Sequence, residues 1–155
     1  MDVSASVPCE YTWIVGNTPS KFVTSGDDYG SRDFSEWYIQ EYETVQIKST
    51  EKIMLSAWWM EQNPGGSTVL MIHGLTGSKA SAGVLLPSGM LYKAGFNILA
   101  IDLRDHGDST CEDGYYSAGQ YESDDSAAAL TWLVEEKNIP TYLFQLRCIQ
   151  YSSLY

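Results

Sequence analysis

The sequence predicts an α/β fold: an N-terminal antiparallel hairpin leading into a mostly parallel sheet with crossover helices. Two near-continuous apolar runs, at 68–72 and 97–101, each end in a loop that carries glycine. Such runs are typical of strands that are covered on both faces. Ligand and reaction sites in these sheets lie at the carboxyl ends of the strands. The residues after 72 and after 101 are therefore the first place to look for chemistry.

The hairpin is predicted from two stretches in which apolar and polar residues alternate. Val45 and Ile47 alternate with polar neighbours, a break follows at 49–52, and the alternation resumes from Ile53 to Trp59. This period of two is that of half-buried strands. Residues 1–40 show turn clusters without a sustained period, and we expect them to form an arm that packs across the sheet edge.

The first crossover helix is predicted from the turn and helix-boundary residues around it. The turn cluster 63–67 feeds the strand 68–72, Pro87 suits a first helical position, and Gly95 suits the residue just past a helix end. These signals predict a short helix over 87–94, followed by a strand over 97–103. Because crossovers of this kind are right-handed, the two strands should be parallel neighbours or near neighbours.

The second crossover helix is expected over 118–137, with Ser117 as its cap. Ser117 with Gln120 has the form of a capping box, and Pro140 follows the predicted end of the helix. A third parallel strand should use part of 141–146. We therefore divide the chain into an N-terminal arm (1–40), a partial domain (41–146), and a divergent or frameshifted tail (147–155).

Composition excludes several classes of function. The 155 residues carry a formal net charge of −11, whereas nucleic-acid and anionic-membrane binding draw on clusters of Lys and Arg. No apolar run approaches the ~20 residues of a membrane span. The first residues lack the pattern of a secretory signal, so a cytoplasmic location is expected. The three cysteines are widely spaced and suggest neither a disulfide framework nor a zinc motif.

Two loops carry a resemblance to a known superfamily. His73-Gly74-Leu75-Thr76-Gly77-Ser78 follows the first buried strand, and Asp102-Leu103-Arg104-Asp105-His106-Gly107-Asp108-Ser109 follows the second. The second loop resembles the D-x-R-x-H-G-x-S loop of the α/β-hydrolase superfamily, and the first resembles the loop after that superfamily's third strand. The resemblance runs from about Tyr42 to Pro140 and covers roughly the first half of a complete hydrolase domain.

The resemblance implies roles for these residues. A backbone N–H of Leu75 or Thr76 would join a second N–H, next to the nucleophile, in an oxyanion hole. Gly74 lets the carbonyl group of a substrate approach closely. The structural loop residues would be His73, Gly74, Asp102, Arg104, His106, Gly107 and Ser109, with Asp102 bonded to a backbone N–H or to Arg104.

The catalytic triad of the superfamily is not found. Its nucleophile lies in G-x-S-x-G, followed along the chain by an acid and a histidine, and no serine here has glycine at both the second position before it and the second after it. The resemblance still implies the reaction of the superfamily, which is hydrolysis of a carboxylic ester, thioester or amide by a serine nucleophile. We expect this chain to be truncated before the nucleophile and inactive alone, taking a small-molecule acyl substrate only if complemented.

The alternative is a non-catalytic binding module, or a split half that a partner chain completes. An uncovered last strand would favour such a partner or self-association. Two cofactor interpretations are weaker. Asp102, Asp105 and Asp108 do not have the spacing of a Ca²⁺ loop, and Gly74 to Lys79 departs from the phosphate-loop pattern. We expect neither a metal nor another cofactor.

Overall fold

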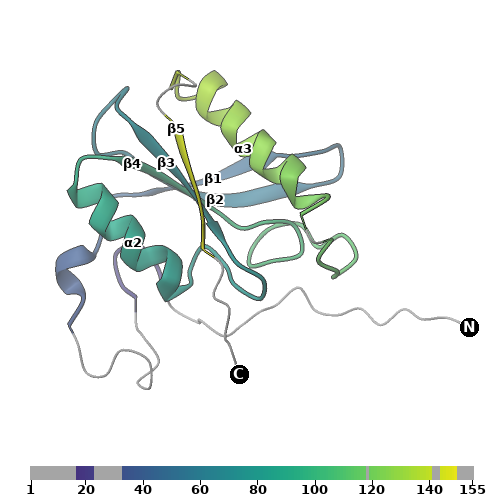
Figure 1. Cartoon of the computed structure of the whole chain (residues 1–155), viewed down its shortest axis with the longest axis horizontal. Coiled ribbons are helices and arrows are strands. Elements are labelled where there is room, and N and C mark those ends of the chain that lie inside the picture. Colours follow the sequence, from purple (N-terminus) through teal and green to yellow (C-terminus); the bar gives the residue numbers. More distant parts are fainter. Residues whose placement is uncertain (1–16, 23–32, 118, 141–143, 150–155) are drawn as a thin grey trace, which may run out of the picture.

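A computed structural model describes residues 17–22, 33–117, 119–140 and 144–149, the last of these by its backbone. Five strands form one sheet in the order β1-β2-β4-β3-β5, and helices cover both faces (Figure 1). The strands are β1 (Glu43–Lys48), β2 (Met54–Met60), β3 (Thr68–His73), β4 (Asn97–Ile101) and β5 (Phe144–Ile149). The helical elements are η2 (Ser35–Trp37), α2 (Ala82–Lys93) and α3 (Glu122–Glu135). The predicted α/β fold class is confirmed.

The strand pairings follow the predicted pattern. β1 and β2 form the antiparallel hairpin, with Val45 opposite Ala57. β3 and β4 are parallel neighbours, with Leu70 opposite Leu99. Both are buried along their whole length, which explains why their sequences are continuous apolar runs rather than alternating ones. The hairpin joins them through an antiparallel pairing of β2 with β4.

The prediction that a helix starts at Pro87 is wrong. α2 already begins at Ala82, and Pro87 lies inside it. The helix begins after Ser81, whose carbonyl accepts the N–H groups of Val84 and Leu85. Proline removes one backbone donor but does not end this helix, because the packing of its buried side against the sheet outweighs a local preference. The predicted end is right, since Gly95 has φ +95 and the N–H of Phe96 bonds to the carbonyl of Leu91.

The predicted start of the second helix is also wrong. α3 begins at Glu122, because a turn containing Gly119 at φ +97 precedes it. Ser117 caps that turn, accepting the N–H of Tyr121 at 2.8 Å. The reciprocal partner of Ser117 is Glu122 rather than the predicted Gln120, since the Glu122 carboxylate accepts the N–H groups of Ser117 and Gly119, both at 2.9 Å.

β5 runs parallel beside β3 and pairs with it from Thr68 opposite Phe144 to His73 opposite Ile149. It forms the end of the sheet opposite β1 (Figure 1). The strand was expected within 141–146, of which 141–143 lie outside the described residues. β5 continues to Ile149, beyond the predicted boundary at 146 between domain and tail.

The core has two layers because successive strand side chains point to opposite faces. Leu70, Ile72, Leu99 and Ile101 pack under Leu133 of α3. The alternate residues pack under α2 on the other face, together with the described parts of the N-terminal arm, and this second layer contains Phe22, Ile39, Trp58, Met60, Val69, Met71, Val84, Leu85, Ile98 and Ala100. The arm was expected across the sheet edge, whereas its described parts lie on the α2 face.

The contact between η2 and α2 yields a first prediction. A Cβ at Gly89 of α2 would collide with the backbone carbonyl and Cβ of Trp37. Gly89→Ala should therefore lower the free energy of unfolding by about 1–3 kcal/mol, despite the better helix propensity of alanine. Urea unfolding would measure this change. Met90→Ala, at a neighbouring side chain that is 50% exposed, is the control and should have a much smaller effect.

Candidate functional site

The loop after β3 forms a tight turn at the carboxyl end of the sheet. The N–H of Gly77 bonds to the carbonyl of Gly74 at 3.0 Å, and Thr76 has φ +65. A positive φ at the third residue of a four-residue turn is what a type II turn requires, and it is rare for a residue other than glycine. Gly77 faces a crowded position, because a Cβ there would lie 3.1 Å from the carbonyl oxygen of Gly74.

The two predicted donors sit in the middle of this turn and face outward. Leu75 is 52% exposed, and Thr76 is exposed as well. No described residue accepts a hydrogen bond from the backbone N–H of either one. Hollows of about 190 and 200 Å³ share His73, Gly74 and Leu75, the first reaching toward α2 and the second toward α3. The turn therefore presents backbone donors between two open cavities.

His73 links the two loops that the resemblance singled out. Its ring is buried; Nδ1 lies 2.8 Å from the carbonyl oxygen of Gly74, and Nε2 lies 3.1 Å from the backbone nitrogen of Leu103. Nδ1 therefore carries the proton, and Nε2 accepts the N–H of Leu103. Burial, with a smaller contribution from His106, lowers the pKa of His73 to about 4, so this ring is neutral near pH 7.

His106 lies against His73, with 4.8 Å between the ring centroids. Its Nδ1 donates to the carbonyl of Arg104 at 2.8 Å, which is a bond within the turn. Both rings are buried below the surface, and each holds backbone groups in place. The geometry places these two histidines as parts of the loop framework.

Asp102 joins the second loop to the first through Lys79. Its Oδ1 accepts the N–H of Lys79 at 2.6 Å, and its Oδ2 accepts the Lys79 ammonium and the N–H of Asp108. The Lys79 side chain is fully buried, with its Nζ 4.9 Å from the ring centroid of Trp58. Gly107 has φ +52, and a Cβ there would collide with the Asp102 carboxylate. Only glycine fits at this position.

Arg104 is held by a different acid. Its guanidinium donates to both carboxylate oxygens of Asp125, at 2.8–3.2 Å, and to Glu112 at 2.9 Å. Asp125 also accepts the backbone N–H of Arg104 and the hydroxyl of Ser49. Hydrogen bonding to Asp125 raises the pKa of Arg104. Of the two partners considered for Asp102, the structure therefore shows backbone N–H groups, and Arg104 pairs with Asp125 instead.

The remaining predicted residues brace the same loop. Ser109 donates its hydroxyl to the carbonyl of Asp102 and accepts the N–H of Ser56. Asp105, at φ +62, accepts the N–H groups of Glu112, Asp113 and Gly114 with one oxygen. The described residues contain no cluster of three or more His, Cys, Asp or Glu side chains arranged to hold a metal ion. The acids of this loop bind protein donors.

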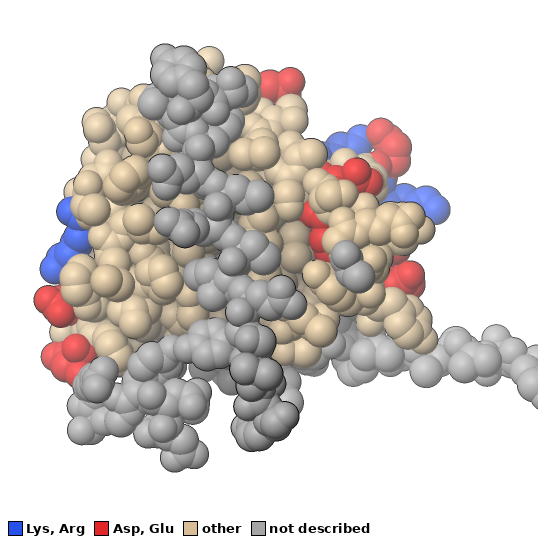
Figure 2. All heavy atoms as spheres, in the orientation of Figure 1, with Lys and Arg blue, Asp and Glu red and all other residues tan. Residues whose placement is uncertain are grey.

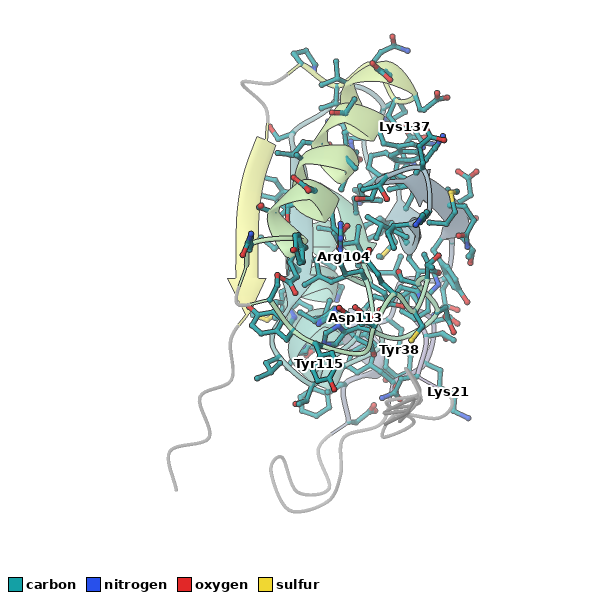
Figure 3. The ribbon with its side chains drawn as sticks, turned by 90° about the vertical axis from the view of Figure 1, so that its right-hand side faces the viewer. Lys21, Tyr38, Arg104, Asp113, Tyr115 and Lys137 are labelled. Carbon is teal, nitrogen blue, oxygen red and sulfur yellow. The ribbon has the colours of Figure 1, made fainter. Side chains whose placement is uncertain are left out.

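β5 completes the surroundings of the turn. Because Ile149 lies opposite His73 in the parallel pair, the chain leaves β5 beside Gly74. The end of β5 therefore lies beside the end of β3, from which the turn with the exposed donors of Leu75 and Thr76 starts. Figure 3 shows the molecule from the side, with Arg104 near mid-height, Asp113 and Tyr115 below it, and Lys137 near the top of the view.

Solved structures match this architecture. An esterase from Pyrococcus furiosus is 28% identical, with a TM-score of 0.62 over 77% of this chain and 45% of its own. The α/β hydrolase GrgF from Penicillium sp. sh18 has a TM-score of 0.64 at 19% identity, over 70% of this chain and 37% of its own. The chain has a partial α/β-hydrolase fold. It spans less than half the length of these relatives. No protein-family model matches the sequence, and curated protein sequences give no significant match.

Within this α/β-hydrolase fold, two residues of the site were missed from the sequence. In the sequence, Lys79 ends a segment that departs from the phosphate-loop pattern, and Asp125 lies within the helix predicted over 118–137. A lysine in an otherwise small-residue loop and an acid in the first turn of a helix were the available signals, and neither identifies its partner. Cys111 is disulfide-bonded, which three widely spaced cysteines did not suggest. No helix in the described ranges is both long and apolar enough to cross a membrane.

Proposed function

We propose that this chain supplies the oxyanion-stabilising half of a serine-dependent acyl hydrolase that acts on a carboxylic ester, thioester or amide. The observation that carries the proposal is the exposed turn, in which the N–H groups of Leu75 and Thr76 have no acceptor among the described residues. It lies at the carboxyl end of β3, beside the point where the chain leaves β5. The fold shared with esterases supports the same interpretation.

The chemistry asks for fixed donors at this position. When a nucleophile attacks an acyl carbonyl, negative charge develops on the carbonyl oxygen, and backbone N–H groups already aimed at it stabilise the transition state without reorganisation. The turn is rigid enough for this because Lys79, three residues downstream of Thr76, is tied to Asp102 by backbone and side chain. In the superfamily a second donor comes from the residue after the nucleophile.

The nucleophile, the acid and the histidine would come from a segment that pairs with the free edge of β5. None of the serines lies in G-x-S-x-G, and His73 and His106 are both used to hold backbone groups. The 155 residues alone should therefore show no turnover, and a partner chain carrying the missing segment would complete the site. Among the described strands β5 ends the sheet, and no described strand pairs with its outer edge, which suits such pairing.

A serine-reactive fluorophosphonate and a backbone amide titration together test this proposal. We expect no covalent labelling of the 155-residue chain. We also expect a small oxyanion such as phenylphosphonate to shift the ¹H–¹⁵N signals of Leu75 and Thr76 more than those of the buried β4 amides. Labelling would show that a nucleophile is present after all. Unshifted Leu75 and Thr76 signals would contradict their assignment as donors.

A binding module is the second candidate. The hollow of about 200 Å³ toward α3 has Ile72, Leu75, Leu103 and Tyr116 in its lining, which suits a small apolar molecule. A neutral aromatic compound that shifts the amide signals of Leu103 and Ser126 more than that of Thr76 would favour this second function. A cytoplasmic location stays a prediction. Disulfides persist in oxidising compartments, and Cys111 is disulfide-bonded. Counting the free thiols of the protein as isolated from cells tests the location, because a cytoplasmic protein should have Cys111 reduced.

A further inference from the structure

Another hollow in the described part of the chain lies away from the proposed oxyanion turn, along β1. A groove of about 780 Å³ runs between β1 and α3, lined by 46–50 and by one side of α3. Successive strand side chains point to opposite faces, and here Ile47 is buried under α3 while Gln46 and Lys48 are exposed. A groove that touches all three in succession follows the strand along its edge.

That edge is open in the described part of the chain. β1 ends the sheet, and its only partner strand there is β2. Its outer backbone N–H and C=O groups are therefore a template for another strand. α3 is fixed beside this edge at both ends, since Ser49 donates to Asp125 at 2.6 Å and Lys137 contacts Glu43 at 3.1 Å. The two walls of the groove are thus joined to each other at both ends.

Its charges select the occupant. Asp124 and Glu135 of α3, and Glu136 at its C-cap, line the groove and are exposed. No described side chain forms an ion pair with them. Lys48, the basic residue of the lining, is already paired with Glu51 at 2.9 Å. Figure 2 shows acidic and basic side chains next to one another on the right-hand side of the molecule, where the tip of the hairpin and the start of α3 lie.

The floor between these acids is apolar. Ile47 is buried there, and Ala127, Ala128 and Trp132 of α3 line the same space. Small alanine side chains leave room for a backbone. The Trp132 ring already has the Lys137 ammonium 5.2 Å from its centroid, and long basic side chains of a partner can lay their aliphatic stems on the part of it that lines the groove while their charged ends reach the carboxylates. We propose that an extended segment of a partner protein, with lysine or arginine at alternate positions, binds here as an added strand on β1.

This mode of recognition is β-augmentation, in which backbone hydrogen bonds give affinity and alternate side chains give specificity. A second copy of the chain is a poorer occupant, because each copy carries a net charge of −11 and the acidic walls would repel one another. The proposal is independent of the proposed hydrolase function, since β1 and β5 form opposite ends of the sheet.

The test uses the whole chain and a fluorescently labelled peptide of six residues, alternating lysine and valine, followed by anisotropy. Binding should be saturable, should weaken with salt, and should shift the amide signals of β1 and of the groove side of α3. Peptides with glutamate in place of lysine, or with alternate amides N-methylated, should bind about tenfold more weakly or not at all. No saturable binding, or equal binding of the N-methylated peptide, would overturn the proposal.

Two sets of substitutions of equal charge locate the site. The triple variant Asp124→Asn, Glu135→Gln, Glu136→Gln should lose about tenfold in affinity. The control triple Glu36→Gln, Glu41→Gln, Glu61→Gln removes the same charge from exposed positions outside the groove and should keep nearly all of it. Equal losses would mean that net charge alone attracts the peptide. A dimer seen by sedimentation whose formation protects the β1 amides from exchange would identify a second copy as the occupant instead.

Discussion

Asp102→Ala should lower the free energy of unfolding by about 3–5 kcal/mol, because it leaves the ammonium of Lys79 buried without its main partner. Asp102 is fully buried and accepts hydrogen bonds from the N–H of Lys79, the ammonium of Lys79 and the N–H of Asp108. Asp108 also contacts Lys79, at 2.8 Å, but its side chain is 80% exposed. It cannot replace Asp102. Urea unfolding at pH 7.5 measures the loss.

Two further variants separate charge from packing. Asp108→Ala, at the exposed end of the same cluster, should cost about 1 kcal/mol or less. Lys79→Met keeps most of the buried volume without the charge, so the double variant Lys79→Met, Asp102→Ala should be more stable than Asp102→Ala alone. A double variant that is less stable than either single one would contradict the account of an uncompensated buried ammonium.

Much of the fold follows from local signals in the sequence. β3 and β4 are continuous apolar runs because helices cover both faces of the sheet, and the hairpin alternates because its β1 strand is half-exposed. The errors fell at helix starts. Pro87 is locally a start signal, yet tertiary packing carries α2 through it. Ser117 caps a turn instead of the helix because Gly119 interrupts the path with a positive φ. At both helix starts the tertiary surroundings outweigh the local preference of one residue.

The sequence indicates where the two loops lie but not how their side chains pair. Glycine next to His73 and the acid after β4 mark loops at strand ends, which the sequence shows directly. Pairings such as Lys79 with Asp102 or Arg104 with Asp125 join residues more than 20 positions apart. They depend on how the two loops and α3 meet. An open edge beside α3 is likewise a property of the sheet order, which places β1 at one end.

His73 should make the fold sensitive to mild acid. The buried ring accepts the N–H of Leu103 at Nε2 and donates from Nδ1 to Gly74. A proton on Nε2 would point a second N–H donor at the N–H of Leu103. It would also place a positive charge in a buried site. Burial is the largest cause that lowers the pKa of His73, to about 4, and the charges of His106 and Lys79 act in the same direction. The carbonyl of Gly74 and the Asp102 carboxylate oppose them.

The sign of the resulting pH dependence is fixed by these values. The unfolded chain takes up the proton near pH 6.5, whereas the folded chain does so only near pH 4. Between the two, the unfolded state binds more protons, so stability falls as the pH falls, by about 3 kcal/mol across the window. Urea unfolding at pH 7.5, 5.5 and ~4 should show this loss. His73→Gln, which has no proton to bind, should start from lower stability and lose less over the same window. Equal losses in both proteins would assign the acid sensitivity to other groups.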